Sequence, residues 1–186
     1  MIHTLTAEMG ARYIAPQYYV VVKMPDEPGD IPNRFELYDW CTLDEGRVLL
    51  AFSFHEWCGD FVKTYYTGEG WNPPRPHNQD ALSLAEVLEY LEPQGTWMVA
   101  FDPMAFAPGK WMRPRKVVTA RYCRRFATEV RRPLEKLFAE KAIEVEECFG
   151  NPDDYLWKIK ELCAPSVPEI VQYAHARTSE WELNHC

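Results

Sequence analysis

An almost unbroken run of apolar residues, 47–54, passes directly into a segment with helical spacing, and this junction constrains the fold more than any other feature. Such a run is typical of a strand whose two faces are both covered. From Trp57 to Tyr65 the apolar residues then recur every three to four positions, as they do on one face of a helix. The sequence therefore predicts an α/β fold in which a central strand is followed at once by a helix.

Other segments have the composition of further strands. Residues 18–24 are mostly β-branched and aromatic, and residues 97–101 are continuously apolar. Residues 35–38 alternate apolar and polar side chains, as an edge strand does. These segments predict a small mixed sheet.

A loop and a second helix separate two of the predicted strands. Residues 68–80 contain three prolines and two glycines, which predicts a long surface loop. Ser83 and Glu86 have the spacing of a capping box, so a helix is expected at 82–91.

The chain from Thr119 onward is expected to be mostly helical. Pro133 interrupts the first helical stretch, which predicts a kink or the start of a new helix at that residue. Two shorter helices are predicted at 153–163 and 168–177.

These elements define the expected fold class. It is a mixed α/β (α+β) fold, in which a small mixed β-sheet is packed with helices and followed by a helical C-terminal region. Residues 1–118 would form the α/β core, and residues 119–186 a helical extension packed on the same core. A chain of 186 residues suffices for one well-buried core.

Half of the positive charge lies in one short stretch of the chain. Residues 113–141 contain ten of the 20 Lys and Arg residues and three acidic residues, a net of +7, whereas the remainder carries −15. A one-sided field of this kind favours binding over chemistry. The net charge of the whole chain, −8, excludes a general nucleic-acid coat protein, whose positive field would cover most of its surface.

Two short segments carry a resemblance to a known family. Ala51-Phe52-Ser53-Phe54 is the end of one predicted strand, and Asp102-Pro103-Met104 follows another. They are similar to the Phe-Thr-Ser and Asn-Pro-Gly segments of the SseB N-terminal domain family, with Asp in place of Asn and Met in place of Gly. The resemblance covers about residues 18–117. It implies a small mixed α/β fold and a regulatory or binding role, and it brings no catalytic residues.

Cys58 is the candidate for an alternative function, that of a thiol-dependent enzyme or redox sensor, with His55 beside it. It lies where a buried strand passes into a helix, and a helix N-terminus would lower the pKa of a thiol. The stretch locally resembles the thioredoxin active-site turn, but Phe61 stands where a dithiol exchanger needs its second cysteine. The simpler interpretation is a small residue packed at a helix start.

No metal or other cofactor is expected. His55 and Cys58 could form half of a zinc site, with His77, His175 or Cys186 as distant partners. Structural zinc sites normally use two close pairs of ligands, and the sequence offers one. Nucleotide-binding and hydrolase motifs such as GxGxxG, GxxxxGK[ST] and GxSxG do not occur.

The strongest candidate site is a set of arginines that share one side of a predicted helix. We call this set the basic face, and it consists of Arg121, Arg124, Arg125, Arg131 and Arg132. Five guanidinium groups repel one another unless an anion lies nearby. The anion could belong to the chain itself, for example to segment 144–147, or to a partner. Guanidinium binds carboxylates and phosphates alike, so residue type does not identify the partner.

The sequence thus predicts a non-enzymatic binding or regulatory module with the basic face as its partner site. An acidic protein surface or self-association is the preferred partner, a thiol-dependent activity at Cys58 is the alternative, and nucleic-acid binding is the third interpretation. The chain contains neither a signal-like start nor an apolar run near the roughly 20 residues that span a bilayer. Six scattered cysteines are expected to be reduced, so the expected location is the cytoplasm.

Overall fold

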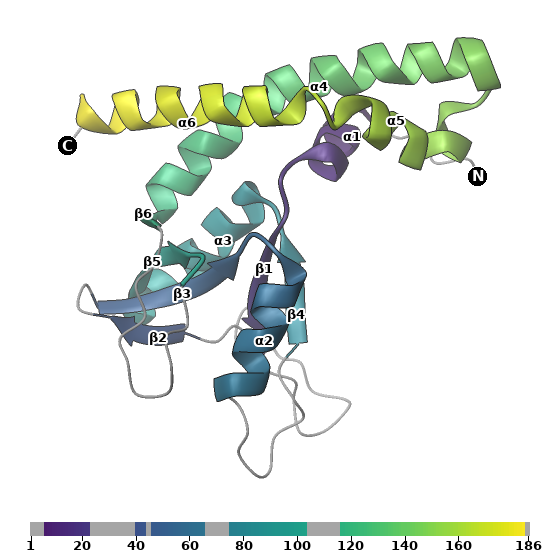
Figure 1. Ribbon diagram of the computed structural model, residues 1–186. Coiled ribbons are helices and arrows are strands. Elements are labelled where there is room, and N and C mark those ends of the chain that lie inside the picture. The colour runs from purple at the N-terminus through teal and green to yellow at the C-terminus, as the bar shows by residue number, and fades with distance from the viewer. Residues whose placement is uncertain (1–5, 23–39, 44–45, 66–74, 104–115, 185–186) are drawn as a thin grey trace. The chain divides into compact units, whose positions relative to one another are not determined.

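The computed structural model describes residues 6–22, 40–43, 46–65, 75–103 and 116–184 (Figure 1). The chain divides into two compact units. The sheet unit is the continuous segment Gln17–Cys123, and the helical unit combines Met1–Pro16 with Arg124–Cys186. The division differs from the one suggested by the sequence, because the first helix belongs with the C-terminal helices.

Within the described residues, six strands form one mixed sheet in the sheet unit. The strands are β1 (Tyr18–Val22), β2 (Trp40–Leu43), β3 (Gly46–Phe52), β4 (Arg75–Gln79), β5 (Thr96–Phe101) and β6 (Lys116–Thr119). Their order is β4-β1-β3-β5-β6, and β2 lies beside β3 off this path. Only the β3–β5 pair among these is parallel. The mixed α/β class expected from the sequence is confirmed.

Strand β3 is the centre of the sheet. One edge pairs with β5, with Leu49 opposite Val99. The other edge is shared, because β2 pairs with its first half, where Trp40 lies opposite Leu49, and β1 with its end, where Tyr19 lies opposite Phe52. A strand with neighbours along both edges contributes its backbone groups to ladders on both sides.

The central strands are buried on both faces, as the sequence predicted. Every residue of 48–52 is buried, and Leu49 and Val99 are fully inaccessible. The continuously apolar run 97–101 is also typical of a buried strand, but its last residue, Phe101, is only half-buried. It is the last residue of β5 and lies opposite the exposed Lys116 at the start of the outer strand β6.

Helix α2 (His55–Tyr65) follows β3 after two residues, which confirms the predicted junction. Its apolar side packs on one face of the sheet, and strand alternation brings every second residue of β3 to that face. The buried residues of α2 and of this face form one apolar cluster, which consists of Val21, Val48, Leu50, Phe52, Cys58, Phe61, Val62, Met98 and Ala100.

Helix α3 (Ala81–Leu91) begins one residue earlier than predicted and has a different cap. The carboxylate of Asp80 accepts a hydrogen bond from the backbone N–H of Ser83 at 2.8 Å, so Asp80 is the N-cap. Ser83 was expected to be the cap and instead lies in the first turn. The helix continues into a short 3₁₀ turn, η2 (Glu92–Gln94), and ends at Gly95, whose φ of 87° suits a residue without a side chain.

Strand β4 lies within a segment that the sequence predicted to be a loop. All five of its residues pair with β1, at the outer end of the sheet. Its sequence, RPHNQ, has no β-branched or aromatic residue, so the pairing with β1 and not local preference forms the strand. Pro76 is tolerated because an edge strand needs only half of its N–H groups for pairing.

The helical unit contains α1 (Ala7–Ile14), the part of α4 (Ala120–Phe149) from Arg124, a 3₁₀ turn η3 (Pro152–Tyr155), α5 (Leu156–Cys163) and α6 (Val167–Leu183). The rings of Phe126 and His175 stack at 4.2 Å, and the thiol of Cys163 lies 4.0 Å from the carbonyl oxygen of Leu137. Helices α5 and α6 therefore return antiparallel to α4 (Figure 1).

Pro133 lies inside α4, and no new helix begins there. Proline has no N–H, so the carbonyl of Glu129 lacks its helical hydrogen bond. Val130 and Leu134, on either side of Pro133, are buried, and their packing keeps the helix continuous where this hydrogen bond is missing.

Some predictions lie outside the described residues, namely the strand at 35–38, Met104 and Cys186, together with the side chain of His77. Among the described helices, none has both the length and the apolar character needed to cross a bilayer.

Candidate functional site

Helix α4, which carries the basic face, is fixed at both ends by caps. The hydroxyl of Thr119 accepts a hydrogen bond from the backbone N–H of Tyr122 at 3.2 Å, and Lys116 donates to the Tyr122 hydroxyl at 2.6 Å. At the other end Gly150 has a φ of 98°, and its N–H donates to the carbonyl of Glu146 at 3.0 Å. This is the usual glycine stop of a helix.

The side of α4 opposite the basic face carries a buried apolar stripe. The stripe consists of Tyr122, Phe126, Val130, Leu134 and Phe138. Burial of this stripe directs the opposite side of the helix to the surface. Four members of the basic face are exposed there, and they are Arg121, Arg124, Arg131 and Arg132.

Arg125, the fifth member, is half-buried and has a structural role. Its guanidinium forms an ion pair with Glu129 one turn away and lies 5.5 Å from the ring of Trp181 on α6. Its Nε atom is buried and has no hydrogen-bond partner within the described part of the chain. Arg125 therefore helps to join α4 to α6 and presents little of its charge to a partner.

Arg131 is exposed but is already held by two carboxylates. Its Nε donates to Glu135 at 2.7 Å, and its guanidinium lies 3.3 Å from Glu8 of α1. The hydrogen bond to Glu135, and then the charge of Glu8, raise the pKa of Arg131 above its already high ordinary value. For Arg125 and Arg131, the anions within the chain are therefore the carboxylates of Glu129, Glu135 and Glu8, and not segment 144–147.

Cys58 does not have the environment of an activated thiol. It is fully buried in the cluster between α2 and the sheet, and burial raises its pKa from 9.0 to about 12. Its backbone N–H donates to the carbonyl of Phe54 at 3.3 Å, so this donor is already used within the chain. The position of Cys58 near a helix start predicted a lowered pKa, whereas desolvation acts in the opposite direction.

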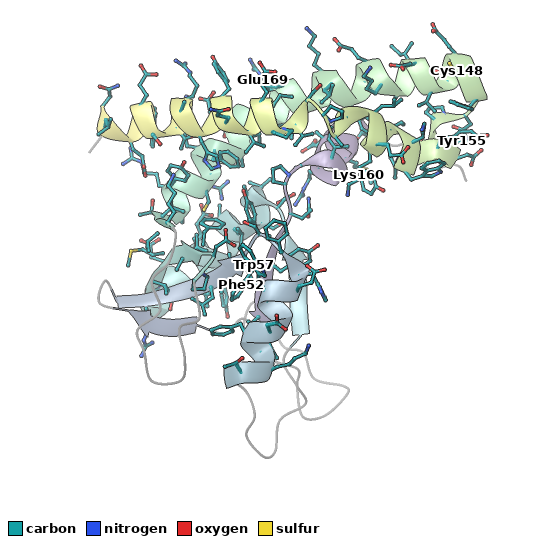
Figure 2. The ribbon with its side chains drawn as sticks, viewed as in Figure 1. Phe52, Trp57, Cys148, Tyr155, Lys160 and Glu169 are labelled. Atoms are coloured by element: carbon teal, nitrogen blue, oxygen red, sulfur yellow. The ribbon has the colours of Figure 1, made fainter. Side chains whose placement is uncertain are left out.

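His55, the other residue of the alternative site, is exposed and packs edge-on against Tyr19, with 5.4 Å between ring centroids. Phe54 and Trp57 beside it are exposed as well, and their rings meet at 4.7 Å. Figure 2 labels Trp57 in the sheet unit. This exposed aromatic pair was not recognised in the sequence, where Phe54 belonged to the apolar run 47–54 and Trp57 fitted a helix face.

The ends of the two parallel strands carry a polar contact that the sequence analysis also missed. Asp102 follows β5, is buried, and accepts hydrogen bonds from the N–H and the hydroxyl of Ser53, which follows β3. Its φ of 47° lies in the left-handed region, which few residues other than Gly, Asn and Asp adopt. The sequence signal that could have indicated this pair is a polar residue at the end of each of two apolar runs.

Metal ligands do not gather in the part of the chain that the structure describes, where no group of three or more His, Cys, Asp or Glu side chains could hold an ion. Four cysteines have described side chains, and all four carry free thiols. Comparison of the chain with protein-family models, with curated proteins and with solved structures found no match.

Proposed function

We propose that the chain is a non-enzymatic binding module with a regulatory role, and that its partner site is the exposed part of the basic face. Three of its four exposed members lie in the helical unit and make the site, namely Arg124, Arg131 and Arg132. The partner is an acidic protein surface. The likeness to the SseB N-terminal domain family is part of this proposal, since that family has a regulatory or binding role.

One observation carries the proposal, namely the direction in which charge runs along α4. The first turn contains Arg121 and no acidic residue, and the last turn contains Glu146 and Glu147 and no basic residue. A helix is positive at its N-terminus and negative at its C-terminus, so each terminal charge here costs roughly 0.3–1 kcal/mol. The arrangement opposes the stability of the helix, and we interpret it as a requirement of binding.

A protein partner is favoured over nucleic acid by the surroundings of the arginines. The second half of the same helix carries Glu140, Glu144, Glu146 and Glu147. A phosphate backbone that followed the helix axis beyond the arginines would meet these carboxylates. A short acidic segment of a protein can contact the arginines alone, which suits a chain with a net charge of −8.

The environment of Cys58 supports a role without thiol chemistry, because a thiol with a raised pKa supplies almost no thiolate at neutral pH. The free thiols at the four described cysteines suit the reducing conditions of the cytoplasm, where we place the protein.

The experiment uses fluorescence anisotropy with two labelled probes, a polyglutamate peptide and a duplex DNA. The test variant is Arg124→Glu with Arg132→Glu. The control variant is Lys158→Glu with Arg177→Glu, which makes the same change in net charge at exposed or half-exposed ion pairs elsewhere in the helical unit. We expect the test variant to bind the peptide at least about tenfold more weakly than the native chain and the control to differ little.

Two results would overturn the proposal. Equal loss in the test and control variants would mean that only net charge matters. Tight binding of the duplex, with a steep fall in affinity as salt is raised and loss in the test variant alone, would replace the acidic partner by nucleic acid.

A further inference from the structure

We infer that the acidic surface bound by α4 is the second half of α4 in another copy of this chain, and that two copies pair through antiparallel α4 helices centred on Ala139. This inference rests on the proposed function and names its partner. Four features of the helix between Arg124 and Phe149 lead to it.

The first feature is the charge symmetry of this segment. Residues 124–136 carry five basic and two acidic side chains, and residues 137–149 carry one basic and four acidic side chains. The two halves therefore have net charges of +3 and −3. An antiparallel second copy places each half against its opposite, whereas a parallel copy places like charges together.

The second feature is an exposed seam along the outer side of the helix. Its members lie at i, i+4, i+7, i+11 and i+14, so they form one stripe. All five are exposed, and they are Arg132, Lys136, Ala139, Ile143 and Glu146. The seam is opposite the buried residues Val130, Leu134 and Phe138, so the packing of the helical unit leaves it open.

The third feature is the order of residues along the seam. Ala139 and Ile143 form a small apolar centre, and the exposed fraction of Ile143 is 57%. Arg132 and Glu146 lie seven residues to either side of Ala139, roughly 10 Å along the axis in each direction. A two-fold axis through Ala139 therefore brings each Arg132 to the Glu146 of the other copy. The small side chain of Ala139 lets the two helices approach at the crossing point.

The fourth feature is the set of ion pairs already formed within the helix. Lys136 is paired with Glu140, and Lys141 with Glu144. Arg132 and Glu146, the two ends of the seam, form no ion pair within the described residues, and the same holds for Glu147. The charges that an antiparallel copy requires are thus the ones that the single chain does not use.

The test is a charge exchange, measured by sedimentation velocity on the full chain over a wide range of concentrations. The native chain is expected to form dimers that weaken as salt is raised, because the apolar centre is small and the end contacts are ionic. Arg132→Glu and Glu146→Arg each replace two attractive contacts by two repulsive ones. Each variant alone should therefore dimerise at least about tenfold more weakly than the native chain.

Mixing the two variants separates this arrangement from every other one. In the mixed dimer, one copy is acidic at both 132 and 146, and the other copy is basic at both positions. Each of the two contacts therefore joins an acidic side chain to a basic one. The mixture should therefore dimerise about as well as the native chain, and the double variant Arg132→Glu/Glu146→Arg should do so by itself. Glu180→Arg, an exposed change on α6, is the control and should leave dimerisation unchanged.

Failure of the inference can be told apart from failure of the proposed function. Dimers that survive both single variants, or single variants that do not combine when mixed, would overturn the antiparallel register. A native chain that stays monomeric would overturn the inference, while the proposed function would stand if polyglutamate still bound through Arg124 and Arg132. A monomer that also failed to bind polyglutamate would overturn both. Far-UV circular dichroism and melting curves check that each variant is folded.

Discussion

The carboxylate of Asp102 accepts two hydrogen bonds from Ser53. The backbone N–H of Ser53 donates to Oδ1 at 2.7 Å, and its hydroxyl donates to Oδ2 at 2.8 Å. The backbone N–H of Asp102 in turn donates to the carbonyl of Ala51 at 2.8 Å. These three hydrogen bonds lock the ends of β3 and β5 together. They also stabilise a left-handed backbone at Asp102 that a residue with a larger or branched side chain would resist.

Three substitutions at Asp102 separate these contributions. Asp102→Gly removes the side-chain hydrogen bonds without backbone strain and should lower the free energy of unfolding by about 1.5–3 kcal/mol. Asp102→Ala adds the left-handed strain and should cost roughly 1 kcal/mol more than Gly. Asp102→Asn, which accepts from one group of Ser53 and tolerates the backbone conformation, should cost least. Urea denaturation measures the series, and an Ala variant as stable as the Gly variant would show that the strain is absent.

Phe52 should be far more sensitive to truncation than Phe101. Phe52→Ala empties a fully buried site and should cost roughly 3–5 kcal/mol of unfolding free energy. Phe101→Ala removes a half-buried ring that packs edge-on against Tyr18, so its cost should be smaller. Chemical denaturation of both variants makes the comparison, and equal losses would mean that the end of β5 is buried in solution.

The buried thiol of Cys58 should make stability depend on pH in the alkaline range. Its pKa is raised to about 12 in the folded chain and is near 9.0 when the thiol is exposed, so the unfolded state loses its proton first. The stabilising contribution is complete below pH 9.0 and is lost as the pH rises from there towards about 12. Cys58→Ala lacks this group and should lose less stability over the same range.

Alkylation gives an independent measure of the same thiol. Iodoacetamide should modify the exposed Cys148 in the folded chain and reach Cys58 only after unfolding. Selective modification of Cys58 in the folded chain at neutral pH would restore the thiol-enzyme alternative.

Two glycines in helices should respond to alanine in opposite directions. A Cβ atom at Gly59 in α2 meets nothing within 4 Å, so Gly59→Ala should stabilise the chain by about 0.5–1 kcal/mol. A Cβ atom at Gly10 in α1 would overlap the ring of the buried Phe138 on α4, so Gly10→Ala should destabilise the helical unit. Thermal unfolding tests both. Adding Phe138→Leu to the Gly10→Ala variant should lessen the loss, and a stabilising Gly10→Ala would mean that α1 is not packed there.

The junction between β3 and α2 could be predicted because its signal is local, a change of period within one stretch of sequence. The cap of α3 was assigned to Ser83, since the capping-box spacing to Glu86 was visible. Asp80 is an equally good capping residue, and the structure shows that its carboxylate binds the N–H of Ser83.

The outer strands could not be predicted in the same way. The sequence of β4 has no preference for a strand, and its partner β1 lies far away in the chain. Helix α1 has only eight residues, and its Gly10 lies against the ring of the distant Phe138. Elements of this kind are stabilised by contacts with distant parts of the chain, and the spacing of apolar residues within one segment does not indicate such contacts.

The candidate site was predictable in part. Helical spacing brought the basic face together, and an Arg125–Glu129 pair at i, i+4 follows the same spacing. The contact of Arg131 with Glu8 joins two distant segments of the chain, and no pattern in either segment indicates it.

The discontinuity of the helical unit sets an order of events during protein synthesis. Helix α1 leaves the ribosome before the sheet unit. Two residues that contact it, Phe138 and Lys160, are made only after the whole sheet unit. The ammonium of Lys160, which Figure 2 labels, lies 4.7 Å from the ring of Tyr13 in α1. A helix of eight residues is marginal in water by itself, so α1 stays without stable structure in the nascent chain while the sheet unit, already complete in sequence, folds. Helices α4 and α5, which are translated after the sheet unit, thus decide when α1 folds.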